Sequence, residues 1–110
     1  MVYNQCEGET NMNHDYLIEE AAKIYKILGN KVRIHILLFL RDHQDSAVSE
    51  IVDHMRLSQP VISKQLGILA KYNLVQSRKE GQHVFYSVKD QDVVQMIDAM
   101  TEHIGHMKKA

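Results

Sequence analysis

The chain has 110 residues, which is enough for one compact domain and too few for a second domain that folds independently. Hydrophobic residues (45%) and charged residues (25%) are balanced as in globular proteins, so we expect little disorder. The formal net charge of −1 indicates no overall attraction to nucleic acid, so any charge that binds DNA must be concentrated locally.

The chain carries no sequence feature of export or membrane insertion. No apolar run approaches the ~20 residues needed to cross a bilayer, and residues 1–13 are polar and unlike a secretory signal. We therefore expect a cytoplasmic protein without a membrane partner, with a flexible N-terminal arm (1–13) and one domain (14–110). Cys6 is the single cysteine, which excludes an internal disulfide and any site made of two thiols. The sequence assigns no role to Cys6 or to the arm.

The first part of the domain is predicted to be helical. Apolar residues at helical spacing indicate helices over about 15–28 and 31–41. Gly29-Asn30 is expected to end the first of them in the left-handed conformation. Ser46 and Ser58 are expected to cap two further helices, which end near residues 55 and 71.

The periodicity changes after residue 73. Residues 74–78 and 83–88 are predicted to be two short strands, joined through Glu80-Gly81-Gln82 with Gly81 supplying the turn. A last helix is predicted from Asp90 to about Met107. A short helix, a tight turn, a capped helix and a hairpin, in this order, are typical of a winged helix-turn-helix. The predicted fold is mainly α with a small β-hairpin (α+β).

The second helix of a helix-turn-helix lies in the major groove, with its N-terminal residues toward the base edges. With Ile62, Leu66 and Leu69 turned inward, its other face carries side chains that can bond bases or phosphate. Basic residues also gather on the hairpin, where a wing would meet the DNA backbone. A merely solvated polar face and a protein-binding winged helix remain the alternatives. The predicted DNA-binding residues are Ser58, Gln59, Val61, Ser63, Lys64, Gln65, Arg78, Lys79, Gln82 and His83.

The last helix carries apolar residues spaced four, three, four, three, the pattern of a helix that packs along another helix. Because the winged domain already has a core, this pattern favours a homodimer formed through the first and last helices. The alternative is that the helix folds back on its own domain. The predicted interface residues are Val93, Ile97, Met100, Ile104 and Met107.

The same helix has two acidic residues at its start, Asp90 and Asp92, and a His-x-x-His pair near its end, His103 and His106. The two ends are ~20 Å apart along one helix, so a shared ion requires two antiparallel helices from two subunits. Two carboxylates and two imidazoles suit tetrahedral zinc or cobalt. Alternatively, the aspartates cap the helix and the histidines interact with its C-terminal dipole.

Three segments resemble the ArsR/SmtB family of repressors, in its zinc- and cobalt-sensing branch. Residues 25–37 are similar to the family's opening segment, 57–66 to its recognition helix and 78–87 to its wing. The resemblance implies a dimeric repressor that leaves its operator when an inducer binds. It also implies a metal site between the paired last helices, at an Asp-x-His and a His-x-x-His or His-x-x-Glu. Asp90, His103 and His106 match this pattern, whereas Asp92 stands where histidine is usual.

Residues 46–50 lack the cysteines of a second, thiolate site found in the family. The leading interpretation is therefore a dimeric repressor of double-stranded operator DNA that is released by zinc, or by cobalt or another divalent metal. The alternatives are a repressor of the same family that answers another signal or none, and a winged-helix protein-interaction module. The sequence contains no nucleophile–base arrangement or phosphate loop, so we expect no enzyme. It leaves the operator, the regulated genes and the metal sensed undetermined.

Overall fold

The computed structural model describes residues 14–109, and the predicted arm with Cys6 lies outside these residues. A three-stranded antiparallel sheet, in the order β1-β3-β2, accompanies five helices and forms the predicted winged helix-turn-helix. None of the helices between residues 14 and 109 is long and apolar enough to span a membrane. The elements are α1 (His14–Leu28), α2 (Lys31–Asp42), β1 (Ser46–Ala47), α3 (Val48–Met55), α4 (Gln59–Lys71), β2 (Val75–Glu80), β3 (His83–Val88) and α5 (Gln91–Lys109).

Local chemistry sets several boundaries as predicted. Ser58 is the N-cap of α4, and its Oγ accepts a hydrogen bond from the backbone N–H of Val61 at 3.4 Å. Gly81 has a φ of 65°, so it supplies the left-handed turn that places Glu80 opposite His83 in the β2–β3 hairpin. The two strands of the wing are therefore in a fixed register from their first residue pair to their last.

Two local predictions are wrong, and both concern short connections. Ser46 does not cap α3: it lies in β1 opposite Tyr86, and its hydroxyl donates to the His43 carbonyl. The Glu50 carboxylate instead accepts the backbone N–H of Ala47, at 2.7 Å. Neither Gly29 nor Asn30 is left-handed. Asn30 is extended, with a φ of −140°, and caps the start of α2 rather than the end of α1.

The core lies where α2, α3, α4 and the sheet meet, and the root of α5 closes it. Helix α2 is central, because it packs against α1, α3, α4, α5 and β3. The side chains of α4 predicted to face inward are fully buried, so the opposite face of that helix is fixed toward solvent. The buried side chains of these elements are Ile36, Leu37, Leu40, Ile51, Ile62, Leu66, Leu69, Leu74, Val75, Val88, Val93, Val94 and Ile97.

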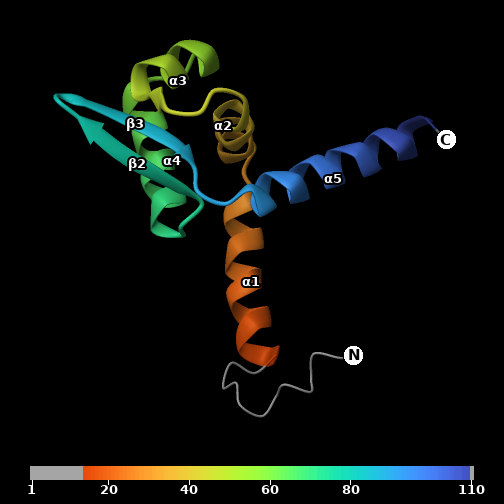
Figure 1. The fold of residues 1–110 in the computed structure, drawn as a ribbon. Helices are drawn as coiled ribbons and strands as arrows, with labels where there is room; N and C mark the ends of the chain where they lie inside the picture. Colours follow the sequence, from red (N-terminus) through yellow and green to blue (C-terminus); the bar gives the residue numbers. More distant parts are fainter. Residues whose placement is uncertain (1–13, 110) are drawn as a thin grey trace.

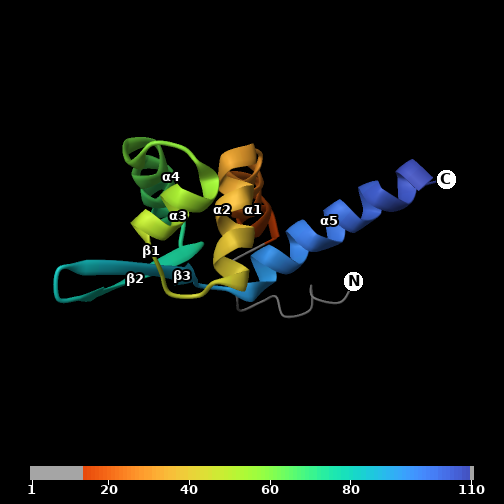
Figure 2. The ribbon, with the colours of Figure 1, turned by 90° about the horizontal axis from the view of Figure 1, so that it is seen from above.

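Helices α1 and α5 project from this body in different directions (Figure 1). Figure 2 shows α5 and the β2–β3 hairpin reaching out on opposite sides of the body. The radius of gyration is 16.7 Å, against ~13 Å expected for a compact domain of this length. A single protomer is therefore an extended body with two helical arms.

The apolar stripe of α5 divides into two parts. Val93 and Ile97, predicted as dimer-interface residues, are buried in the core of their own protomer. The spacing rule could not separate these roles, because a core face and an interface face repeat at the same interval. Beyond them the stripe is exposed, at 56% for Met100, 47% for Ile104 and 60% for Met107.

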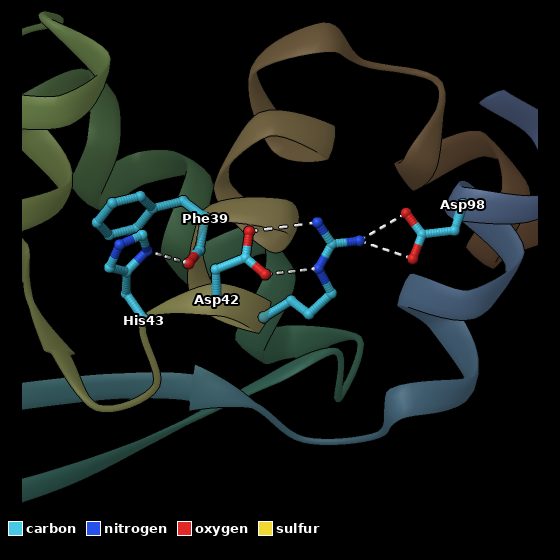
Figure 3. A network of polar contacts seen from close by, with 5 residues as sticks. Phe39, Asp42, His43 and Asp98 are labelled. Atoms are coloured by element: carbon cyan, nitrogen blue, oxygen red, sulfur yellow. Dashed lines mark hydrogen bonds and ion pairs between the residues drawn. The ribbon is translucent and has the colours of Figure 1, made fainter. Parts of the chain in front are cut away.

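A polar link between α2 and α5 fixes the direction in which α5 leaves the body. Arg41 Nη1 donates to both carboxylate oxygens of Asp98, at 2.5 and 2.6 Å, and Arg41 Nε donates to Asp42 at 3.0 Å. Figure 3 shows the guanidinium between the two carboxylates, beside the stacked rings of Phe39 and His43. The hydrogen bond from Arg41 lowers the pKa of Asp42, and the two carboxylates, Asp42 first, raise the pKa of Arg41. The arm is thus held at its root by apolar burial and by charge.

We predict that Arg41→Met lowers the Tm at pH 7 by a few degrees, because both carboxylates lose their partner and exposed pairs contribute modestly. The folded state depresses the pKa of Asp42 below its usual 3.8. That contribution is therefore present above pH 3.8 and lost as the pH falls through the depressed value. In circular-dichroism melts, the difference in Tm between wild type and Arg41→Met should become smaller in acid. Lys26→Met, which removes a charge from the exposed last turn of α1, is the control. Equal melts of wild type and Arg41→Met, or a gap that widens in acid, would contradict the link.

Candidate nucleic-acid interface and metal-ligating residues

The exposed face of α4 begins at its N-terminus, where the predicted DNA-binding residues lie. Ser58, Gln59, Ser63 and Lys64 are exposed, and Val61 is 40% exposed. Although Ser58 Oγ accepts the capping bond, its hydroxyl hydrogen can still be donated to a phosphate. Backbone N–H groups at a helix start also favour anions. This face therefore offers donors for phosphate and amide, hydroxyl and ammonium groups for base edges.

Gln65 differs from the expectation that it faces outward freely. It is half-buried, and its Oε1 accepts a hydrogen bond from Arg33 Nη1 on α2 at 2.7 Å. Sequence reasoning missed Arg33, since a contact between residues 32 positions apart leaves no trace in local periodicity. One of the predicted contact residues of α4 is thus already engaged by another helix.

The wing carries Lys79, Gln82 and His83 in exposed positions around its turn. Arg78 is exposed as well, but its guanidinium has partners within the protomer. Its Nη1 lies 3.1 Å from Glu80 Oε2 and its Nη2 lies 3.7 Å from Asp45 Oδ2. Its guanidinium carbon also lies 5.0 Å from the centre of the Phe85 ring. The positive charge of the wing is therefore partly compensated by neighbouring carboxylates.

The four predicted metal ligands are all exposed and lie at the two ends of α5. Within residues 14–109, no three His, Cys, Asp or Glu side chains are grouped so that they could hold a metal. Asp90 Oδ1 accepts the backbone N–H of Asp92 at 2.9 Å, so Asp90 also caps the helix. At 3.6 residues per turn, Asp92 and His103 lie within about 20° of each other around the axis. Carboxylate and imidazole thus share one flank of α5, and a four-ligand site needs a second helix.

An apolar cleft of about 570 Å³ lies between the end of α1, the start of α2 and the exposed part of α5. Apolar side chains of α5 form one wall, among them Met96, Met100 and Ile104. Tyr25 and Leu28 of α1 form part of the opposite wall. The cleft is continuous with the exposed stripe of α5, so an apolar surface extends over the two arms.

The sequence profile of the family described as "Bacterial regulatory protein, arsR family" matches residues 30–77, from the N-cap of α2 into β2. Among curated proteins, an HTH-type transcriptional regulator of Methanocaldococcus jannaschii is 38% identical over 84 residues, which are 76% of this chain and 94% of the relative. The transcriptional activator HlyU of Vibrio cholerae is 36% identical over 74% of each chain. The transcriptional repressor SmtB of Mycobacterium tuberculosis is 30% identical over 81% of this chain and 65% of the relative.

Among solved structures, a homodimeric winged helix-turn-helix DNA-binding domain from Mycobacterium bovis superimposes with a TM-score of 0.75. It is 24% identical and is matched over 94% of this chain and 95% of that one, a likeness that shows the fold. The described chain thus shares its architecture with DNA-binding regulators over nearly its whole length.

We predict that Glu80→Gln raises the affinity for duplex DNA, because Arg78 loses a competing carboxylate and becomes available to phosphate. The slope of log affinity against log salt should steepen by about 1, the effect of one added phosphate contact. Fluorescence anisotropy over a salt series would measure both. In an Arg78→Ala background the gain should shrink, whereas Glu102→Gln on α5 should change neither quantity. A gain of equal size with and without Arg78 would show that Glu80 acts by general repulsion.

Proposed function

Because this chain belongs to the arsR family of bacterial regulatory proteins, we propose that it is a dimeric repressor whose release from operator DNA is triggered by a divalent metal, zinc first. It is a DNA-binding transcriptional regulator and not an enzyme. The observation that carries the proposal is the layout of α5. On one projecting helix, an exposed apolar stripe runs beside a flank that bears the Asp92 carboxylate at one end and the His103 imidazole at the other.

Dimer formation is supported by the surfaces of the two arms. Exposed apolar residues of α1, among them Tyr16, Leu17 and Tyr25, accompany the exposed stripe of α5. Burying such side chains between two copies would stabilise the dimer by ~25 cal/mol for each Å² of apolar surface removed from water. A two-fold arrangement would cover the same patch on both copies, and the Mycobacterium bovis neighbour of the same fold is homodimeric.

An antiparallel pairing of two α5 helices would complete the ligand set. The start of one helix would then lie beside the end of the other, which brings Asp90 and Asp92 of one copy to His103 and His106 of the second. The bond between Asp90 Oδ1 and the Asp92 N–H leaves the second Asp90 oxygen to bind a cation. Two carboxylates and two neutral imidazoles balance the charge of Zn²⁺ or Co²⁺ and suit tetrahedral coordination. The symmetry of the dimer makes two such sites.

Metal binding and DNA binding would be coupled through the angle between the two subunits. Each site joins the two subunits, and each subunit carries one α4. The spacing of the two α4 helices must match successive major grooves. An arrangement fixed by the ligands that departs from this spacing lowers the affinity for DNA, and linkage requires that DNA lowers the affinity for metal equally. Coupling of ~1–3 kcal/mol per site is enough to empty an operator.

A metal-independent regulator of the same family is the second candidate. The capping bond between Asp90 and the Asp92 N–H gives Asp90 a purely structural role. The relatives also include both a repressor, SmtB, and an activator, HlyU. In this second reading the dimer and its DNA contacts are unchanged, and the ends of α5 serve only the helix itself.

For the metal response, we predict that zinc weakens operator binding by wild type at least fivefold, the lower end of typical allosteric coupling. His103→Ala should bind the operator as wild type does but lose this response. The effect should also weaken in acid, because metal ligands must be unprotonated. Anisotropy with an operator enriched from a random duplex library, with and without zinc, makes the comparison. If zinc weakens both proteins alike, or neither, the metal-independent regulator is the better account.

For the dimer, we predict that Met100→Asp shifts the protein to monomer. Two facing carboxylates would be placed in an apolar interface, at a cost of several kcal/mol unless they are neutralised. Sedimentation velocity measures the shift. Val61→Asp is the control, since Val61 lies on α4, away from both arms, and is an apolar side chain that is 40% exposed. A Met100→Asp protein that remains dimeric would place the interface elsewhere.

A further inference from the structure

The Arg33 guanidinium, on α2, connects the end of α1 with α4, the helix that carries the predicted DNA-binding residues. It lies in the first turn of α2 and is partly buried. Its Nε donates to the Ile27 carbonyl in the last turn of α1 at 2.8 Å, and its Nη1 donates to Gln65 Oε1 on α4 at 2.7 Å. Carbonyls in the last turn of a helix lack intrahelical partners. The bond to Ile27 therefore satisfies one of them and fixes the position of the guanidinium.

The chemistry of this contact determines which end of the Gln65 amide points away from Arg33. A guanidinium has only donors, so the amide oxygen must face it. The Gln65 nitrogen, which carries two N–H donors, is consequently directed to the other side. A free glutamine can offer both its oxygen and its nitrogen to adenine. A glutamine held by Arg33 keeps its oxygen beside the guanidinium and turns its two N–H donors to the other side.

We propose that Arg33 is a positioning residue for DNA recognition: it holds the oxygen of Gln65 so that the side chain directs its N–H donors to the duplex. The acceptor on DNA is either a base-edge acceptor, such as guanine O6 or N7 or thymine O4, or a phosphate oxygen. This inference rests on the proposed DNA-binding function. It adds a specificity element outside α4, and that element is fixed to the end of α1.

The pre-ordering of Gln65 has a measurable consequence. Immobilising a flexible side chain on binding costs about 0.5–1.5 kcal/mol, so a side chain that is already ordered binds about two- to tenfold more tightly. The effect of Arg33 on DNA affinity should therefore exist only while Gln65 is present. A merely structural role of Arg33 at the α1–α2 junction would act with or without Gln65.

A double-mutant cycle tests the inference. Duplexes enriched with wild type from a random library are titrated against Arg33→Met, Gln65→Met and the double variant, and melts of all four proteins are recorded. We expect Gln65→Met to lose about tenfold in affinity and Arg33→Met to lose about two- to tenfold. The double variant should bind like Gln65→Met alone. Gln65→Glu, which keeps the acceptor for Arg33 but has no donor, should also lose affinity while its Tm does not fall.

Base preferences identify the acceptor. If Arg33→Met and Gln65→Met both lose the base preference at the same base pair, the acceptor is a base edge. If both lose affinity equally for all sequences, the acceptor is a phosphate oxygen. Lys79→Ala on the wing is the control and should weaken binding without changing preferences. Additive losses in the cycle, or a Gln65→Met protein that binds as wild type does, overturn the inference. Should Arg33→Met fail to fold, Arg33→Lys, which keeps the charge but has only one donor group, takes its place in the cycle. A wild type that enriches no duplex overturns the proposed function itself.

Discussion

The structure depends on one constraint: residues 14–109 of a single chain do not bury the apolar surface of their two arms. The winged body uses α2, α3, α4 and the sheet for its core, and of the two arms only the root of α5 and the end of α1 at Leu28 take part in it. The outer part of α5 and the outer face of α1 stay exposed beside an apolar cleft. Since exposed apolar patches of this kind mark interaction surfaces, the arms account for the extended shape and for the proposed pairing of two copies.

Two arginines of α2 hold the two arms, and one of them also holds the helix that is proposed to face DNA. Arg41 holds Asp98 and so sets the direction of α5. Arg33 holds the last turn of α1 and, at the same time, Gln65 of the reading helix. A change in how the arms of two copies pair would therefore be passed through α2 to α4. This arrangement would link the proposed metal site, which lies far from α4 along the chain, to the proposed DNA-binding face.

The sequence was sufficient wherever local chemistry decides the conformation. Ser58 caps α4 and Gly81 makes the wing turn because their own side-chain chemistry permits it, and the spacing of Ile62, Leu66 and Leu69 fixed their burial. It was insufficient where distant residues decide. Ser46 pairs with β3, which begins 37 positions later. Val93 and Ile97 share the spacing of an interface but enter the core. The DNA and metal contacts stay predictions, because they involve molecules outside the chain.

The central claim is that the functional unit is two copies joined through α1 and α5. Sedimentation equilibrium of the wild-type chain at several micromolar concentrations, without metal or DNA, tests it most directly. The account predicts one species with twice the 12.7 kDa mass of a single chain. A species of 12.7 kDa at every concentration would contradict it. The exposed faces of the two arms would then need another partner, and the proposed ligand set at the ends of α5 could not assemble.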